Sequence, residues 1–193
     1  MSNLAIKQEQ KYTYADYKTW NDEDRFEIIN GTVYNMSPSP MRRHQEVTGE
    51  LYVVFKRFLK NKKCKVFISP FDVRLTDYKN QHDDKIETVV QPDIVIVCDE
   101  EKLDNYGCKG SPDIVIEVTS PSTIKRDKIE KFVLYEKYGV KEYWIVYPDL
   151  NIIEIYKLFN AQYGKPEVYG KDHKIEVKYL GELIIDVNEI FNQ

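Results

Sequence analysis

The chain has 193 residues, of which 42% are hydrophobic and 31% are charged, and its formal net charge is −4. This composition is typical of a globular protein, and we expect a single domain over residues 1–193, with residues 1–12 as a flexible N-terminal segment. The acidic balance excludes a protein that binds nucleic acid through its overall charge. No apolar run approaches the ~18–20 residues of a membrane helix, so we expect no membrane partner.

Three cysteines, Cys64, Cys98 and Cys108, form an odd set without a C-x-x-C pair. Such a set predicts a reducing cytosol and argues against a zinc ribbon. The segment Met1–Gln10 also lacks the apolar core of a signal peptide. We therefore expect a cytoplasmic protein whose cysteines have no role in its function.

The first elements expected in chain order are a short helix and a hairpin. Thr13–Trp20 is expected to be helical, with Thr13 or Asp16 as its cap. Asn30-Gly31 lies between two apolar runs and indicates a two-residue hairpin turn, because both turn positions require a positive φ. Ser37–Pro40 interrupts the chain after the hairpin.

A longer helix and several strands are expected next. Apolar residues recur at helical spacing from Val47 to Phe58, which predicts a helix over about 43–60. Residues 64–69 and 71–75 are typical of strands, whereas the polar residues 76–90 predict an exposed loop. A second helix should follow Thr123 and end at Gly139, before strands at 142–147 and 152–158 and a closing strand and helix. Antiparallel hairpins with at least one helical crossover indicate an α/β fold.

Two segments nearly repeat each other and differ at one informative position. Pro92–Val97 (PDIVIV) recurs as Pro112–Val118 (PDIVIEV), and Glu117 takes the position that Val97 holds in the first copy. Both segments are β-branched and apolar on both faces, as buried strands are. An ionised carboxylate among Ile and Val is costly unless a cation or several donors compensate it. This pattern predicts that Glu117 is an acid of a metal site.

Strand geometry decides which aspartate can accompany Glu117. Asp113 lies four residues away on the same strand, roughly 13 Å distant, which is too far for two ligands of one cation. If the two strands form an antiparallel pair, the start of one lies beside the end of the other. The predicted pair is therefore Asp93 and Glu117, and Asp113 is expected at a turn or strand entry.

An ordered series of motifs resembles a known family. The matching segments are Phe26–Gly31, Ser37–Pro40 with His44, Gln91–Asp93, Ile116–Thr123, then Asp127, Lys131, Tyr135, Gly139-Val140 and Glu142–Val146. The series is similar to the PD-(D/E)XK nuclease superfamily and, more narrowly, to the bacterial Uma-two family of putative restriction endonucleases. The resemblance implies a restriction-endonuclease-like α/β fold, with a mixed β-sheet flanked by helices. It also implies phosphodiester cleavage that depends on a divalent metal.

The resemblance also implies roles for particular residues. Asp93, Glu117 and the carbonyl of Val118 would hold Mg²⁺ or Mn²⁺. The superfamily's lysine two positions after the glutamate is Thr119 here, and Lys131 on the following helix matches the lysine that replaces it in this family.

The helix that carries Lys131 leaves a simpler interpretation open. Its apolar face is expected to contain Ile129, Phe132 and Val133, whereas Asp127, Lys131, Leu134 and Tyr138 lie opposite. Asp127 and Lys131 could form an ordinary i, i+4 pair worth ~0.3–0.5 kcal/mol. The resemblance favours the catalytic role.

Two further candidates also have alternatives. Glu27 is a catalytic candidate because the family has a glutamate before this hairpin turn, where it can extend the metal shell. It could instead be a cross-strand partner of Tyr34 or form an exposed pair with Arg25. His44 could contact phosphate or metal, although a lone histidine is more often a surface or capping residue.

The predicted function is a metal-dependent endonuclease that hydrolyses phosphodiester bonds, with DNA as the expected polymer and RNA left open. Local basic clusters can contact phosphates even on an acidic protein, although charge alone favours solvated helix faces. The residues expected to contact nucleic acid are Arg42, Arg43, His44, Lys125 and Lys128. The alternatives are a catalytically inactive nucleic-acid- or protein-interaction module on the same fold, and a carboxylate-pair hydrolase acting on sugars.

A homodimer is also expected, because nucleases of this superfamily that cut both strands commonly pair two subunits. The strand candidates 142–147 and 152–158 are rich in Tyr, Trp and Ile and could bury an apolar face against a twin. Packing of the same residues inside one subunit is the alternative.

Overall fold

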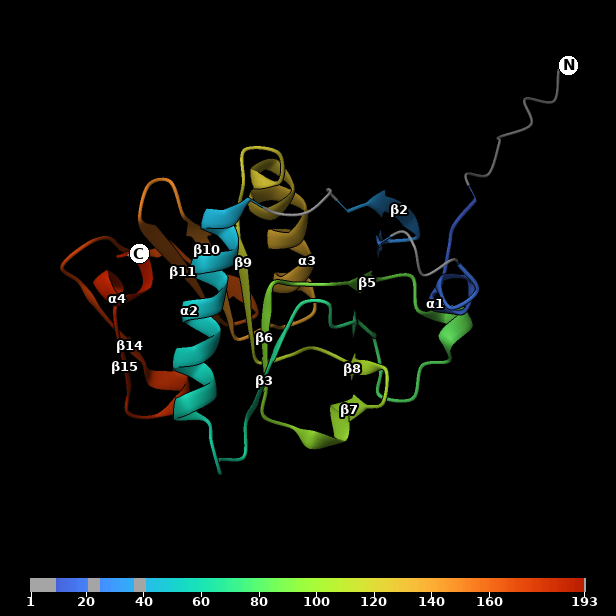
Figure 1. The fold of residues 1–193 in the computed structure, drawn as a ribbon. Helices are drawn as coiled ribbons and strands as arrows, with labels where there is room; N and C mark the ends of the chain where they lie inside the picture. The colour runs from blue at the N-terminus through green and yellow to red at the C-terminus, as the bar shows by residue number, and fades with distance from the viewer. Residues whose placement is uncertain (1–9, 21–24, 37–40, 193) are drawn as a thin grey trace, which may run out of the picture.

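The computed structural model describes residues 10–20, 25–36 and 41–192 (Figure 1). The predicted interruption at Ser37–Pro40 and residues 1–9 of the predicted flexible segment lie outside these ranges. Lys11 and Tyr12 are attached to the folded chain: Lys11 pairs with Glu87 at 2.6 Å, and the Tyr12 amide donates to the Gly31 carbonyl. The predicted flexible segment therefore does not extend to residue 12.

The larger sheet has seven strands within the described residues and carries both halves of the near-repeat. The order is β12-β11-β10-β9-β6-β3, with β13 paired to β11. The strands are β3 (Lys65–Ile68), β6 (Ile94–Val97), β9 (Ile114–Val118), β10 (Glu142–Tyr147), β11 (Ile152–Phe159), β12 (Gln162–Tyr163) and β13 (Glu167–Tyr169). The two copies, β6 and β9, form an antiparallel pair, as the site prediction required. Strands β9 and β10 are parallel, and the predicted helical crossover joins them.

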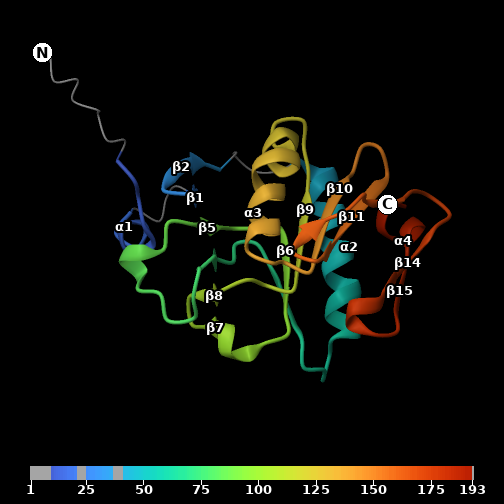
Figure 2. The same cartoon turned by 180° about the vertical axis from the view of Figure 1, so that it is seen from behind.

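Helices cover both faces of this sheet. Figures 1 and 2 show α2 (Arg42–Phe58) on one face and α3 (Phe132–Lys137) on the other. Alternate side chains of β6 follow these two faces, because successive residues of a strand point to opposite sides. Ile94 and Ile96 pack with α2, whereas Val95 and Val97 pack in the core that includes α3. Burial of both faces explains why these strands are continuously apolar.

A six-stranded sheet lies beside the α3 face and carries the N-terminal hairpin. Its order is β2-β1-β5-β4-β8-β7. The strands are β1 (Phe26–Ile29), β2 (Thr32–Asn35), β4 (Val73–Arg74), β5 (Val89–Val90), β7 (Leu103–Asp104) and β8 (Gly107–Lys109). The Asn30-Gly31 turn has φ values of 51° and 83°, as predicted. The helix α1 (Tyr14–Tyr17) packs near η1 (Asp83–Lys85), and Thr13 caps α1 in a capping box with Asp16.

The C-terminal segment covers the outer side of α2. It contains β14 (Lys174–Val177), η4 (Lys178–Leu180), β15 (Leu183–Asp186) and α4 (Val187–Phe191). The side chains of Ile175, Ile185 and Phe191 are buried in the same core as Leu51 and Phe55 of α2. The predicted closing strand and helix are thus confirmed. They pack against the side of α2 that faces away from the larger sheet.

The crossover helix buries a different face from the predicted one. It begins with a π-helical turn, η3 (Arg126–Lys131), and continues as α3. Ile129 and Val133 of the predicted apolar face are 57% and 59% exposed, whereas Asp127 and Lys131 are buried. The helix buries the face of Asp127, Lys131 and Leu134 and not the more apolar one, because other buried charges compensate Asp127 and Lys131 inside the molecule.

Two further expectations need correction. Residues 76–90 are an exposed loop only in part: 77–80, 82, 84 and 85 are exposed, whereas Gln81, Ile86 and Thr88 are buried and β5 lies within this range. Cys64 and Cys98 form a disulfide, and η2 (Glu100–Lys102) follows the second of these cysteines. The cysteine argument for a reducing cytosol therefore fails, and a cytoplasmic location stays a prediction. Among the described residues, no helix is both long and apolar enough to cross a membrane.

The strands proposed for dimerisation are largely buried inside one subunit. Tyr143, Trp144, Ile145 and Val146 of β10 have no exposed surface, because β10 lies between β9 and β11 and both of its faces are covered. The packing alternative is therefore correct for β10. The apolar face on which the homodimer prediction was based is therefore not available on β10. The homodimer stays a prediction.

Two glycines, one in a crowded position and one in an open position, provide a matched test of the packing in this fold. Gly107 has a φ of 126°, and a Cβ at this position would lie 2.2 Å from the Asp72 carbonyl oxygen, whereas a Cβ at Gly49 within α2 would meet nothing within 4 Å. We expect Gly107→Ala to lower the free energy of unfolding by at least ~2 kcal/mol, because the backbone must move. Gly49→Ala should raise it by about 0.5–1 kcal/mol. Urea denaturation of both variants measures the two changes, and equal stabilities would contradict this packing.

Candidate active site

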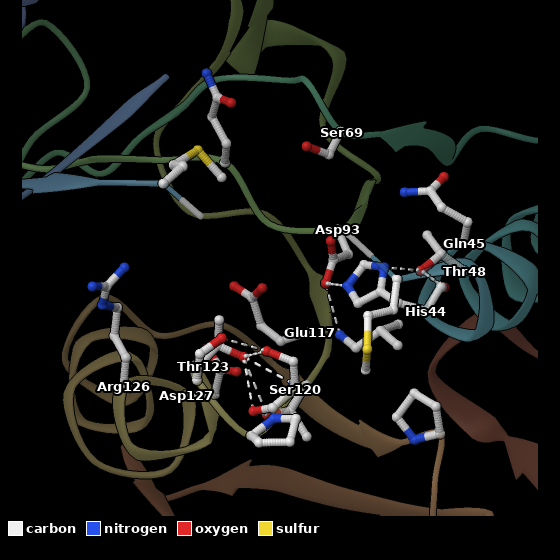
Figure 3. A pocket seen from close by; sticks show the side chains of 18 of the residues that line it. His44, Gln45, Thr48, Ser69, Asp93, Glu117, Ser120, Thr123, Arg126 and Asp127 are labelled. Atoms are coloured by element: carbon white, nitrogen blue, oxygen red, sulfur yellow. Dashed lines mark hydrogen bonds and ion pairs between the residues drawn. The ribbon is translucent and has the colours of Figure 1, made fainter. Parts of the chain in front are cut away.

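A cavity of about 590 Å³ lies where the ends of β6 and β9 meet the start of α2 and the crossover helix (Figure 3). In Figure 3, Asp93 and Glu117 lie next to each other at its centre, with His44 on one side and Arg126 on another. The cavity wall includes the sequence-predicted residues Glu27, Arg43, His44, Asp93, Glu117, Val118 and Lys131. Segments from both sheets and two helices therefore contribute to one site.

The two acids of the predicted pair are neighbours. The antiparallel register places Ile94 opposite Ile116, so the next positions along the two strands are Asp93 and Glu117. Oδ2 of Asp93 accepts a hydrogen bond from the Val118 amide at 2.8 Å. Asp113 lies at the entry of β9, where it accepts a hydrogen bond from the Cys98 amide. The predicted pairing and the separate role of Asp113 are both confirmed.

Lys131 lies between two buried carboxylates. Its Nζ is 2.9 Å from Oε1 of Glu117 and 2.9 Å from Oε1 of Glu27. The Tyr135 hydroxyl, one turn further along the helix, donates to the same Glu117 oxygen at 2.9 Å. The ion pairs that the described residues give Lys131 are therefore with Glu27 and Glu117, and the simple i, i+4 pair with Asp127 was the wrong alternative.

The charges of this group depend on each other. Burial raises the pKa of Glu117 well above its ordinary value; Lys131 opposes this rise, whereas Asp127, Asp93 and Glu27 add to it. Burial alone would lower the pKa of Lys131, but the surrounding carboxylates Glu117, Glu27 and Asp127 raise it overall. Lys131 is therefore a cation at neutral pH, held by an excess of buried acids.

Glu27 reaches the cavity from the other sheet. It lies on β1, where Tyr34 is its cross-strand partner in register, but its side chain turns toward Lys131. The Gln91 amide donates to Oε1 of Glu27 at 3.0 Å, which connects β1 to the segment just before Asp93. Arg25 bonds to Gln91 and Ser69, so an exposed Arg25–Glu27 pair was the wrong alternative. Glu27 is 1% exposed, and its role is inside the site.

His44 also belongs to the site rather than to the surface. Its Nε2 is 3.3 Å from Oδ2 of Asp93, and its side chain is 14% exposed. Burial works to lower the pKa of His44, but hydrogen bonding with Asp93, the Asp93 charge and the Val118 backbone raise it overall. The surface interpretation of His44 was wrong, because the first turn of α2 lies against Asp93 at the start of β6.

Asp127 is a fourth acid of the cavity. It is 3% exposed and lies on the π-helical turn. Burial raises its pKa, whereas Lys131 and hydrogen bonds with Thr123 and Thr119 oppose the rise. From the sequence, Asp127 was considered only as an i, i+4 partner of Lys131. This spacing does not indicate whether the two side chains are buried.

The donor set fits a hard divalent cation completed by water. Among the described residues, no group of three or more His, Cys, Asp or Glu side chains is arranged to hold a metal ion. Asp93, Glu117 and Val118 nevertheless all line the cavity, and their carboxylate and carbonyl oxygens are the donor types that such a cation takes. Mg²⁺ keeps several waters and takes one or two carboxylates, so this small set suits it. A cation here would also offset the charges of Asp127, Asp93 and Glu27, which raise the pKa of Glu117 beyond the effect of burial.

Three of the predicted nucleic-acid contacts lie outside the cavity wall. Arg42 is exposed and faces Glu46 at 3.5 Å, Lys125 is exposed, and Lys128 pairs with Glu154 at 2.5 Å. Arg43 lines the cavity but donates to Asn151 and to the Phe191 carbonyl. Sequence reasoning missed a set of lining residues as site components: Arg25, Gln91, Thr119, Thr123, Arg126 and Asp127. Gln91 had one available signal, its position directly before Pro92-Asp93.

Comparisons with known proteins agree with this architecture. The uncharacterized protein slr1290 of Synechocystis sp. is 25% identical over 127 residues, covering 65% of this chain and 62% of that protein's length. The crystal structure of a putative nuclease belonging to DUF820 from Anabaena variabilis has a TM-score of 0.73 at 19% identity, covering 94% of this chain and 98% of that one. This likeness confirms the predicted α/β fold.

A family model also matches most of the chain. Residues 13–188 match the family Uma2, whose description is putative restriction endonuclease. The matched range contains β1, β6, β9 and the crossover helix, and therefore every residue of the Glu27, Asp93, Glu117 and Lys131 group. The chain belongs to the Uma2 family of putative restriction endonucleases.

Proposed function

We propose that the protein is a metal-dependent endonuclease that hydrolyses phosphodiester bonds in DNA. The observation that carries the proposal is the meeting of Asp93 and Glu117 from neighbouring strands in one cavity with the buried cation Lys131. Membership of a family described as putative restriction endonucleases supports the same reaction class. DNA is proposed as the polymer, and RNA is the alternative substrate that the assay below includes.

The metal is proposed to be Mg²⁺ or Mn²⁺, held by Asp93, Glu117 and the carbonyl of Val118. Within the described residues, the Val118 amide donates a hydrogen bond to Oδ2 of Asp93, and Lys131 and Tyr135 donate to Oε1 of Glu117. When bound, the ion neutralises the acids and polarises a phosphoryl oxygen. The protein's own contribution is to hold both carboxylates in fixed positions on adjacent strands.

Lys131 is proposed to act as a fixed cation beside the attacking water. Its raised pKa keeps it protonated, so it cannot accept the proton of that water. It can instead orient the water and stabilise the negative charge that develops on the phosphate. In the overall hydrolysis, a hydroxyl is added to phosphorus and a proton to O3′ as the P–O3′ bond breaks, which leaves a 5′-phosphate.

Glu27 and Tyr135 are proposed to position this machinery. Glu27 holds Lys131 from the side opposite Glu117, and Tyr135 donates to the Glu117 oxygen that Lys131 also contacts. A lysine side chain is long and flexible, so two carboxylate partners fix its ammonium group more firmly than one would. Electrostatic stabilisation of a transition state requires that the charged groups beside it are held in fixed positions.

Two other functions make different predictions in one assay. A non-catalytic interaction module on the same fold would show no turnover, and a sugar hydrolase would need no metal and would leave Lys131 without a role. Incubation with supercoiled DNA, single-stranded DNA and RNA, each with Mg²⁺, Mn²⁺ or EDTA, distinguishes these cases. The proposal requires cleavage with a metal and none with EDTA.

Metal binding should depend on both acids of the pair. We expect Asp93→Asn and Glu117→Gln each to abolish Mn²⁺ binding in calorimetry, because each removes one of two anionic ligands. Asp113→Asn is the matched control, since this aspartate has the same place in the duplicated segment but lies outside the cavity wall. Undiminished Mn²⁺ affinity in both site variants would show that the cation binds elsewhere.

The stability of the metal-free protein should depend on Glu117 and on pH. The folded-state pKa of Glu117 lies above its ordinary value of 4.5, so its ionisation destabilises the fold as pH rises from 4.5 toward the folded pKa. We expect Glu117→Gln to have a higher Tm than the wild type at pH 7.5 in EDTA, and a similar Tm at pH 4. Thermal melts at the two pH values measure this, and a lower Tm at pH 7.5 would contradict it.

Cleavage should require Lys131. Lys131→Ala alone would leave two buried acids without their cation and could cost about 3–5 kcal/mol of stability. The double variant Glu27→Gln/Lys131→Met reduces this cost, because it leaves one buried acid, Glu117, without its cation and not two. We expect it to fold and to lose about 10²-fold or more in cleavage rate. Lys137→Met, an exposed lysine of the same helix, is the control, and wild-type cleavage by the double variant would reduce Lys131 to an ion-pair partner.

A further inference from the structure

Arg25 is a cation of the cavity wall that neutral groups hold in place. Its Nε donates to Oε1 of Gln91 at 3.1 Å, and its terminal NH2 group donates to the same oxygen and to the Ser69 hydroxyl, both at 2.7 Å. Among the described residues, no carboxylate forms an ion pair with Arg25. Neutral groups therefore fix its position, and within the described part of the chain its charge has no carboxylate in contact.

The neutral partner Gln91 is itself fixed by other contacts. Its Nε2 donates to Oδ1 of Asp72 at 2.8 Å and to the Tyr17 hydroxyl at 3.0 Å, and it is 8% exposed. Gln91 precedes Pro92-Asp93, so the support of Arg25 and the support of Asp93 belong to the same short segment. This connection places the guanidinium in a defined position relative to the acidic pair.

Arg126 is a second available cation on another part of the wall. Its guanidinium carbon lies 4.7 Å from the centre of the Tyr34 ring, and its NH1 is 3.9 Å from Oε2 of Glu27. Glu27 makes its shorter contact, at 2.9 Å, with Lys131, so it compensates Arg126 only weakly. Ser69, which holds Arg25, and Arg126 lie on different sides of the Asp93–Glu117 pair in Figure 3.

Other cations near the site are more fully engaged. Lys128 lies 2.5 Å from Glu154 and also donates to the Tyr156 hydroxyl, and Lys131 lies between two acids. Arg43 donates to Asn151 and to the Phe191 carbonyl, and its ring contact is with Phe191 of the C-terminal helix. These contacts use the guanidinium of Arg43 to attach α4 to α2. Among the arginines that line the cavity in the described residues, Arg25 makes no ion pair and Arg126 makes only the 3.9 Å contact with Glu27.

We propose that Arg25 and Arg126 form a phosphate clamp, which binds backbone phosphates of the substrate on either side of the one that is cut. This inference rests on the proposed function and identifies the residues that hold its substrate. A guanidinium binds phosphate oxygens through paired N–H donors and is always charged. The clamp also solves an electrostatic problem, because a cavity lined by five acidic residues would repel a polyanion unless fixed cations offset them.

The clamp makes a quantitative prediction for DNA binding. Each phosphate contact contributes ~0.9 to the slope of log affinity against log salt concentration for duplex DNA, and ~0.7 for a single strand. We expect Arg25→Gln and Arg126→Gln each to reduce this slope by about one such contact, and the double variant by about two. Arg25→Lys should keep the slope but lower the affinity, because lysine keeps the charge without the paired donors.

The measurement is fluorescence anisotropy with labelled duplex and single-stranded DNA over a series of NaCl concentrations, in EDTA and again with Ca²⁺. Arg57→Gln is the matched control, because Arg57 is exposed near the C-terminal end of α2. That end lies roughly 20 Å along the helix from the turn that lines the cavity. The salt-dependence slope of Arg57→Gln should equal that of the wild type. Thermal melts check that each variant is folded, and Arg126→Gln serves if Arg25→Gln does not fold.

The outcomes separate the clamp from the proposed reaction. Slopes unchanged in both Arg25→Gln and Arg126→Gln would overturn the clamp, even if the wild type cleaves DNA. A reduced slope in a protein that cleaves no nucleic acid under any metal condition would support the clamp and overturn the endonuclease. A wild type that binds neither duplex nor single-stranded DNA would overturn both.

Discussion

The contact of Lys131 with Glu27 and Glu117 joins the three parts of the molecule that form the cavity. Glu27 comes from the smaller sheet, Glu117 from the larger one, and Lys131 from the crossover helix between β9 and β10. Each acid alone would be a costly buried charge, and the single ammonium compensates both. The relative position of the two sheets and the charge state of the site therefore depend on one interaction.

Even with Lys131 in place, acidic side chains outnumber basic ones at the centre of the cavity. Burial is the main cause of the raised pKa of Glu117, and the charges of Asp127, Asp93 and Glu27 raise it further. The proposed cation would compensate this excess of negative charge. Arg25 and Arg126, held at the wall by neutral or weakly paired groups, add the positive charge that a polyanionic substrate would require.

The fold supplies this geometry by simple means. An antiparallel pair of nearly identical strands places Asp93 beside Glu117, because the start of one strand lies at the end of the other. The parallel pairing of β9 with β10 requires a crossover, and the crossover helix brings Lys131 back over Glu117. The first turn of α2 then places His44 against Asp93. Fold and site thus come from the same connections.

The sequence by itself determined the pair of acids and most of the elements. Strand alternation and the substitution of Glu117 for Val97 in the repeat are local patterns, and the Asn30-Gly31 turn has one favourable geometry. Only the tertiary structure decided the partners of Lys131, the burial of His44 and Asp127, the pairing of Cys64 with Cys98, and the neutral support of Arg25. These features join segments far apart in the chain. A charged side chain carries no local sign of whether water or another buried charge will compensate it.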